Sequence, residues 1–301
     1  RACGRERAGR ACGMNTQRDT GAAVHLDHVG YIVRDLDACA ALVRQLGFVL
    51  TARADHTRTD AQGLSVPAGS SQHSIMLHSG YVELMQITDP HAGHQLASAP
   101  SQRHGLHVLA FGTGDAVACH ARRIADGVAA GEVLYWSRPV HEPDLQGMAQ
   151  FAYFGSAWTP RDPSYLCWVE HRTPRLLRNP RLLAHDNGAR ALIGIRYAGP
   201  VAALAPWTAQ LRAAGARLVH DGAQHKRLAL PDAVIDVDAD ARCASVLPQS
   251  LSWGGADLHW LRAQCARMGL RCEVHDDGTL EVDLQSVLGM NWRFLPAKPA
   301  A

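Results

Sequence analysis

The stretch LDHVGYIVRDLD, residues 26–37, decides the fold. Its first half predicts a short β-strand with His28 near the middle. Asp35 or Asp37 can cap the helix that follows, whose apolar residues recur at helical spacing and which ends at Gly47. Because a strand holds its side chains on a rigid element, His28 is well placed to be a metal ligand.

The same order of elements recurs along the chain: a strand, a helix ended by glycine, and three further strands. The first copy runs from about Val24 to Thr88, and a second begins with GLHVLAFGTGDAVACHARRIADG at residues 105–127. Further copies are expected from residue 191 (ALIGIRYAG) and from residue 245 (SVLPQSLSW). A repeat of about fifty to eighty residues indicates an array of equivalent folding units, so the sequence predicts four modules of one kind.

Two acids interrupt otherwise apolar strand faces. Glu83 lies in YVELMQI, the last strand of the first module, and Glu170 lies in YLCWVEH, the last strand of the second. An unpaired buried carboxylate is unfavourable, and a cation at the sheet surface would explain both acids. Each acid also follows a histidine in the first strand of its module: His28 lies 55 residues before Glu83, and His107 lies 63 residues before Glu170.

These four side chains, two imidazoles and two carboxylates, predict a divalent metal site for Ni²⁺, Zn²⁺, Mn²⁺, Co²⁺ or Fe²⁺. Any one of them alone is better explained as a satisfied core histidine or a rim carboxylate, whereas all four in register in two repeats favour the metal. Other histidines lie near these strands and are alternative ligands: His25, His56, His73, His78, His104 and His171. Alternation along the strand argues against His171 as a replacement for Glu170 on the same face.

The opening D-H-V-G, followed by D-L-D and a helix ending in L-G-F, resembles the vicinal oxygen chelate superfamily of glyoxalase I, fosfomycin-resistance proteins and extradiol dioxygenases. The resemblance implies an α+β protein of four βαβββ modules in two pairs, each pair forming a curved mixed sheet around a cleft. Residues 23–176 would be the metal-binding pair. Residues 189–297, which lack a histidine matching His28, would be a degenerate pair that supports the first. The connector LLAHDNGA, residues 182–189, is similar to that of glyoxalase-like proteins of bacteria.

The resemblance also implies chemistry. A metal on His28, Glu83, His107 and Glu170 would stabilise an enediolate or oxyanion of a small oxygenated molecule, with Glu83 or Glu170 as general base in a lyase or isomerase reaction. Binding by His28, His107 and Glu170 alone would leave open positions on Fe²⁺, as in a ring-cleaving dioxygenase.

A protein that only binds a small molecule is the third alternative. Such a protein would use an apolar and aromatic pocket, although aromatic residues fill cores by default. The lining candidates are Tyr81, Met85, Phe111, Tyr135, Trp136, Phe151, Tyr153 and Trp168.

Composition bears on the partners and the cellular compartment that the sequence predicts. A net charge of +2 gives no electrostatic footprint for nucleic acid, and the sequence has no apolar run of membrane-spanning length. The eight cysteines form no C-x-x-C pair, which is typical of a reducing, cytoplasmic compartment. Residues 1–22 are expected to be a disordered leader. The expected binding partner is a small-molecule substrate. Paired modules can assemble within one chain or across a homodimer.

Overall fold

The structure, a computed structural model, describes residues 24–297 except residues 61 and 102. The expected leader at residues 1–22 lies outside the described residues. The first module contains β1 (His25–Ile32), α1 (Leu36–Gln45), β2 (Ala54–Thr59), β3 (Ser65–Met76) and β4 (Tyr81–Ile87). The second contains β5 (Gly105–Gly112), α2 (Ala116–Ala125), β6 (Leu134–Glu142), β7 (Leu145–Gly155) and β8 (Tyr165–His171).

The second half repeats this order twice. The third module contains β9 (Ala191–Gly199), α3 (Val201–Ala213), β10 (Arg217–Asp221), β11 (His225–Ala229) and β12 (Val234–Ala239). The fourth contains β13 (Leu247–Ala256), α4 (Leu258–Met268), β14 (Cys272–Val274), β15 (Leu280–Val282), the added short helix α5 (Gln285–Leu288) and β16 (Asn291–Pro296). Short 3₁₀ turns lie at Ala99–Ser101, Pro174–Leu176 and Pro180–Leu183. The predicted α+β fold of four βαβββ modules is confirmed. In the described part of the chain, no helix is both long and apolar enough to cross a bilayer.

The two pairs of modules close differently. The first pair forms a closed barrel in the order β1-β4-β3-β2-β6-β7-β8-β5, because β2 pairs with β6 and β1 pairs with β5. The second pair forms an eight-stranded sheet, β10-β11-β12-β9-β13-β16-β15-β14, which stays open with β10 and β14 at its edges. Only the barrel therefore encloses an interior.

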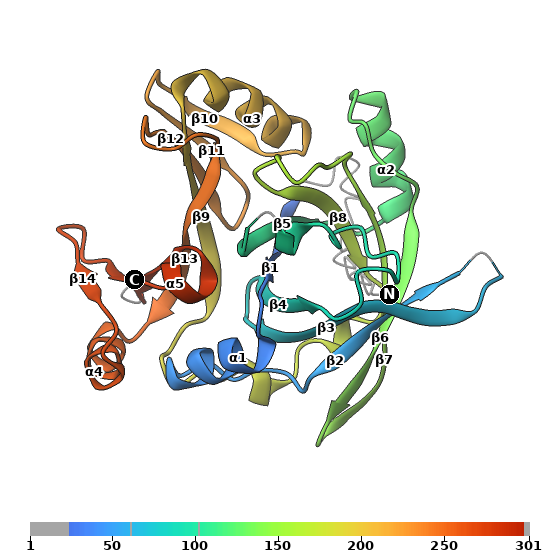
Figure 1. Cartoon of the computed structure of the whole chain (residues 1–301), viewed down its shortest axis with the longest axis horizontal. Helices are drawn as coiled ribbons and strands as arrows, with labels where there is room; N and C mark the ends of the chain where they lie inside the picture. Colours follow the sequence, from blue (N-terminus) through green and yellow to red (C-terminus); the bar gives the residue numbers. More distant parts are fainter. Residues whose placement is uncertain (1–23, 61, 102, 298–301) are drawn as a thin grey trace, which may run out of the picture.

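The open sheet stands beside the barrel and shares its core (Figure 1). Outward-facing side chains of β1 and β5, such as Tyr31 and Phe111, belong to one hydrophobic cluster with Trp253 and Trp292 of the second sheet. The Trp292 indole donates a hydrogen bond to the Tyr31 hydroxyl at 2.9 Å. Burial of this much apolar surface joins the two halves into one packed unit.

Aspartates cap the helices of the first two modules. Asp35, and not Asp37, caps α1 by accepting a hydrogen bond from the Ala38 amide at 2.9 Å. Asp115 caps α2 through the Ala118 amide in the same way. These two caps mark equivalent points in the first and second modules.

The LLAHDNGA connector has a structural role. The His185 imidazole accepts from the Val49 amide at 3.0 Å and donates to the Met76 carbonyl at 2.9 Å. The Asn187 amide group donates to the Leu46 carbonyl at 2.8 Å, and its own backbone carbonyl accepts from the Asp257 amide at the start of α4. The motif therefore fastens the first module to the second sheet.

Candidate functional site

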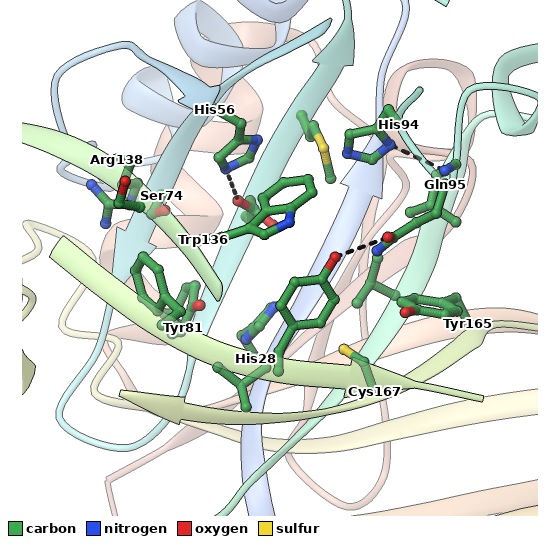
Figure 2. Close-up of a pocket in the computed structure, with 18 residues that line it drawn as sticks. His28, His56, Ser74, Tyr81, His94, Gln95, Trp136, Arg138, Tyr165 and Cys167 are labelled. Atoms are coloured by element: carbon green, nitrogen blue, oxygen red, sulfur yellow. Dashed lines mark hydrogen bonds and ion pairs between the residues drawn. The ribbon is translucent and has the colours of Figure 1, made fainter. Parts of the chain in front are cut away.

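The barrel interior contains a cavity of about 100 Å³ to which all eight strands contribute side chains (Figure 2). Its wall combines imidazole and carboxylate groups with apolar and aromatic side chains. The lining residues are His28, His56, Ser74, Tyr81, Glu83, Met85, His94, Gln95, Leu96, Val108, Trp136, Ser137, Arg138, Phe151, Tyr153, Tyr165, Cys167 and Val169.

His28 is held by a buried carboxylate. Its Nδ1 lies 2.7 Å from Asp27 Oδ2, and His171 Nε2 lies 2.8 Å from the other oxygen of Asp27. Burial acts to raise the pKa of Asp27, but the hydrogen bonds and charges of His171 and His28 outweigh it, so the pKa lies well below its usual range. An ionised carboxylate only accepts hydrogen bonds, so His28 donates from Nδ1 and its Nε2 is left for the cavity.

A β-bulge and an aromatic ring fix the position of this pair. The register of β1 against β5 shifts between Leu26 and His28, which places Asp27 beside the ring of its neighbour. Tyr81 stacks on the His28 ring with centroids 4.4 Å apart and planes at 23°. The imidazole is therefore fixed in both position and orientation.

Glu83 also faces the cavity, as predicted, and is paired with His56 of β2. Glu83 Oε1 lies 3.2 Å from His56 Nε2, and His56 Nδ1 lies 2.8 Å from the Ser70 hydroxyl. Burial acts to raise the pKa of Glu83, but the hydrogen bond and charge of His56, followed by the charges of His28 and Arg138, lower it to about 2. Glu83 is therefore a carboxylate at neutral pH.

The other two predicted ligands do not line the cavity. His107 is 1% exposed and donates from Nδ1 to the Gly105 carbonyl at 2.9 Å. Glu170 accepts a hydrogen bond at 2.9 Å from the Ala116 amide at the N-terminus of α2, outside the barrel. The structure thus brings together His28 and Glu83 but not His107 and Glu170, so the expected convergence of all four is corrected.

Strand register explains the correction for the histidine. His28 of β1 is the partner of Tyr81 on β4, whereas the residue of β5 that partners the matching Tyr165 on β8 is Val108. The helix caps give the same answer, because Asp35 follows His28 by seven positions and Asp115 follows Val108 by seven. Val108, and not His107, is therefore the counterpart of His28.

The same register gives the counterpart of Glu83. Glu83 stands two positions after Tyr81, and Cys167 stands two positions after Tyr165. Cys167 lines the cavity, and Glu170 does not. Counting back from the two capping aspartates reveals the first of these offsets in the sequence, and the second follows only from the strand register.

The donor set does not fit the metal site that the superfamily implies. Over the residues that the structure describes, no group of three or more histidine, cysteine, aspartate or glutamate side chains is arranged to hold a metal ion. The second module gives the cavity Val108, Val169 and Cys167, and burial raises the pKa of the Cys167 thiol far above its usual range. Among the described lining residues, the first module supplies His28, His56 and the carboxylate of Glu83, and the connector after β4 supplies His94.

Of the eight residues predicted to line a pocket, five line the cavity and three do not. Phe111 and Trp168 belong to the cluster on the outer face of the barrel, and Tyr135 is 49% exposed. Those that do line the cavity are Tyr81, Met85, Trp136, Phe151 and Tyr153.

The sequence did not single out Arg138 or His94, which both line the cavity, and it indicated His56 only as an alternative ligand. His56 was only one of several nearby histidines, and Arg138 lies in EVLYWSRPV, where nothing distinguishes it from a surface arginine. Which residues face the cavity follows from the pairing of β2 with β6, which no local pattern encodes.

Comparison with known proteins agrees with the fold. A family model described as a glyoxalase-like domain matches residues 26–215, more than half of the chain. The chain belongs to the glyoxalase-like domain family. Through it the chain is a member of the vicinal oxygen chelate superfamily. No curated protein matches this glyoxalase-like chain.

Solved structures resemble the glyoxalase-like chain over most of its length. A hypothetical protein from Staphylococcus aureus is similar with a TM-score of 0.62 and 12% identity, covering 91% of this chain and 99% of the other. A mutant 4-hydroxymandelate synthase from Streptomyces coelicolor is similar with a TM-score of 0.59 and 12% identity, covering 93% and 95%. A fusion protein of a xylose isomerase-like barrel with 4-hydroxyphenylpyruvate dioxygenase has a TM-score of 0.53 and 11% identity, covering 93% and 49%. At such low identity these likenesses show the fold alone.

Proposed function

We propose that the protein is a lyase or isomerase that transfers a proton on a small oxygenated molecule bound in the barrel cavity, with His28 as the acid and base. The observation that carries this proposal is the buried pair of Asp27 and His28, joined at 2.7 Å beside the barrel cavity. Histidine is the side chain best suited to give and take protons near neutral pH.

Asp27 supports the reaction through His28. When His28 Nε2 takes a proton from the substrate, the ring becomes an imidazolium, and the ionised Asp27 beside Nδ1 stabilises that charge. Asp27 is 3% exposed, so little water screens the interaction. Return of the proton to a neighbouring atom of the substrate completes an isomerisation, and loss of a leaving group completes an elimination.

Glu83 has a supporting role. Its pKa of about 2 makes it a weak base at neutral pH, and its nearest partner is the His56 ring at 3.2 Å. The negative charge of Glu83 also acts on His28 and favours the imidazolium that forms there. Glu170, the other candidate base, caps α2 outside the cavity and has no part in this mechanism.

The ring-cleaving alternative lacks its predicted ligands. It requires His28, His107 and Glu170 around one Fe²⁺, and the last two do not line the cavity. We therefore derive no step through a metal ion. The small-molecule binding alternative uses the same cavity and is separated from catalysis by experiment.

The test is proton exchange at carbon. The protein is incubated in D₂O with a panel of small carbonyl and carboxylate compounds that carry an acidic C–H, and ¹H NMR follows exchange and product formation. The wild type is expected to catalyse exchange on at least one compound, and His28→Asn is expected to lose at least about a hundredfold in rate, the lower range for one acid–base group.

His107→Asn is the matched control, because it removes the histidine one position away from the true counterpart of His28. Its activity should equal that of the wild type, with circular dichroism to verify the fold and the exposed His78→Asn variant as a second control. Equal exchange by His28→Asn and the wild type would refute the assignment. Binding of a panel compound with no exchange would instead support the sequestering function.

A further inference from the structure

Arg138 of β6 is a buried cation without a partner. It lines the cavity and is 7% exposed. None of the described residues forms a hydrogen bond or an ion pair with its guanidinium, although the charges of Tyr81, Glu83 and Glu142 act on it from farther away. Burial lowers the pKa of Arg138 more than these groups raise it. An arginine remains charged in proteins, so its burial is unfavourable unless a hydrogen-bonded anion compensates it.

Arg123, also buried in the described part of the chain, shows what the fold does when the role is structural. Arg123 of α2 is 9% exposed, donates to the Ala213 carbonyl at 2.8 Å, and pairs with Asp126 at 3.3 Å. Arg138 has neither kind of contact. A guanidinium kept unpaired beside an empty space is therefore available to an anion that enters the cavity.

The surroundings limit which anion fits. The cavity that Arg138 lines also has apolar side chains in its wall, so the body of the ligand is apolar. They include Trp136, Phe151, Val169 and Leu96. Glu83 is a carboxylate on the same cavity, and its charge opposes a dianion more strongly than a monoanion. A guanidinium binds a carboxylate through two parallel hydrogen bonds, so a monocarboxylate satisfies both conditions.

We propose that Arg138 binds the carboxylate of a small substrate with an apolar body and holds that substrate against the wall that carries His28. Tyr81 connects the two, because it stacks on His28 and lies within the electrostatic reach of Arg138. The binding site stands on its own geometry, and only its place in the reaction depends on the proposed function. Arg138 is thus assigned as the residue that selects anionic substrates.

Ligand pairs of matched shape test this assignment. Phenylacetate and isobutyrate are compared with phenylacetamide and isobutyramide, and phenyl phosphate serves as the dianionic probe, by isothermal titration calorimetry and thermal denaturation. The wild type is expected to bind at least one carboxylate about tenfold or more tightly than its amide, and more tightly than phenyl phosphate. Arg138→Gln should abolish the preference for carboxylate, Arg138→Lys should keep part of it, and the exposed Arg181→Gln should leave it unchanged.

The outcomes separate the two proposals. If the wild type binds no carboxylate better than its amide, the assignment of Arg138 is wrong, and this comparison does not depend on whether any variant folds. A preference for phenyl phosphate would overturn the choice of a monocarboxylate. His28→Asn should retain the carboxylate preference while losing proton exchange. Carboxylate binding without exchange in the wild type would refute only the proposed function, and exchange without carboxylate preference would refute only the role of Arg138.

Discussion

The substitution Glu83→Gln should weaken the dependence of the protein's stability on pH. The pKa of Glu83 falls from 4.5 to about 2 in the folded protein. A pKa that is lower in the folded than in the unfolded state adds stability above the unfolded value, and this stability is lost as the pH falls toward the folded value. At about 1.4 kcal/mol per pH unit, Glu83 contributes about 3 kcal/mol at pH 7, of which about 2 kcal/mol is lost by pH 3.

Urea unfolding at pH 7, 5, 4 and 3 measures this contribution. The free energy of unfolding of the wild type should fall by about 2 kcal/mol more than that of Glu83→Gln between pH 7 and pH 3. Glu132→Gln, in an exposed loop, removes the same net charge and should follow the wild type. Parallel curves for the wild type and Glu83→Gln would show that Glu83 is not held in the folded state by His56, and the assignment of the buried pair would be refuted.

Three further predictions test the architecture. Glu170→Ala should lower the free energy of unfolding by about 1 kcal/mol through loss of the bond to α2, with no change in carboxylate binding by calorimetry. Val108→His combined with Cys167→Glu should create a Co²⁺ site that is visible by absorption and tighter than in either single variant; equal affinity in all three would contradict the register. Trp292→Ala should destabilise the barrel and the second sheet together by about 3–5 kcal/mol in one urea transition, and two separate transitions would contradict a shared core.

The fold could be predicted because its signals are local and repeated. A strand, a helix followed by glycine and three strands recur four times, and a capping aspartate begins the helix in three of these modules. Each part depends on neighbours in sequence. Closure of one pair and not of the other could not be predicted, because it depends on β2 meeting β6 while β10 and β14 remain apart. No residue in those strands indicates which strand, so distant along the chain, will pair with it.

Of the four residues predicted for the site, His28 and Glu83 line the cavity, and His107 and Glu170 do not. The alternation of side chains along β8 places Glu170 on the same face as Trp168, and the structure agrees. Alternation does not indicate which face of a strand points into a barrel. His107 is predicted as a ligand because it is a histidine in the first strand of its module. The position equivalent to His28 is one residue later, at Val108. A shift by one residue reverses the face, and chemical identity alone could not reveal it.

The concentration of imidazole and carboxylate groups in one module has a stereochemical consequence. His28 and Glu83 project from the paired strands β1 and β4, whereas the described residues of β5 and β8 that line the cavity offer neither group. In the proposed mechanism, a substrate in the cavity would exchange its proton with His28, from the side of β1 and β4. We therefore expect deuterium to be delivered to a single prochiral face, so that exchange at a prochiral carbon gives one enantiomer of the monodeuterated product and not a mixture of both.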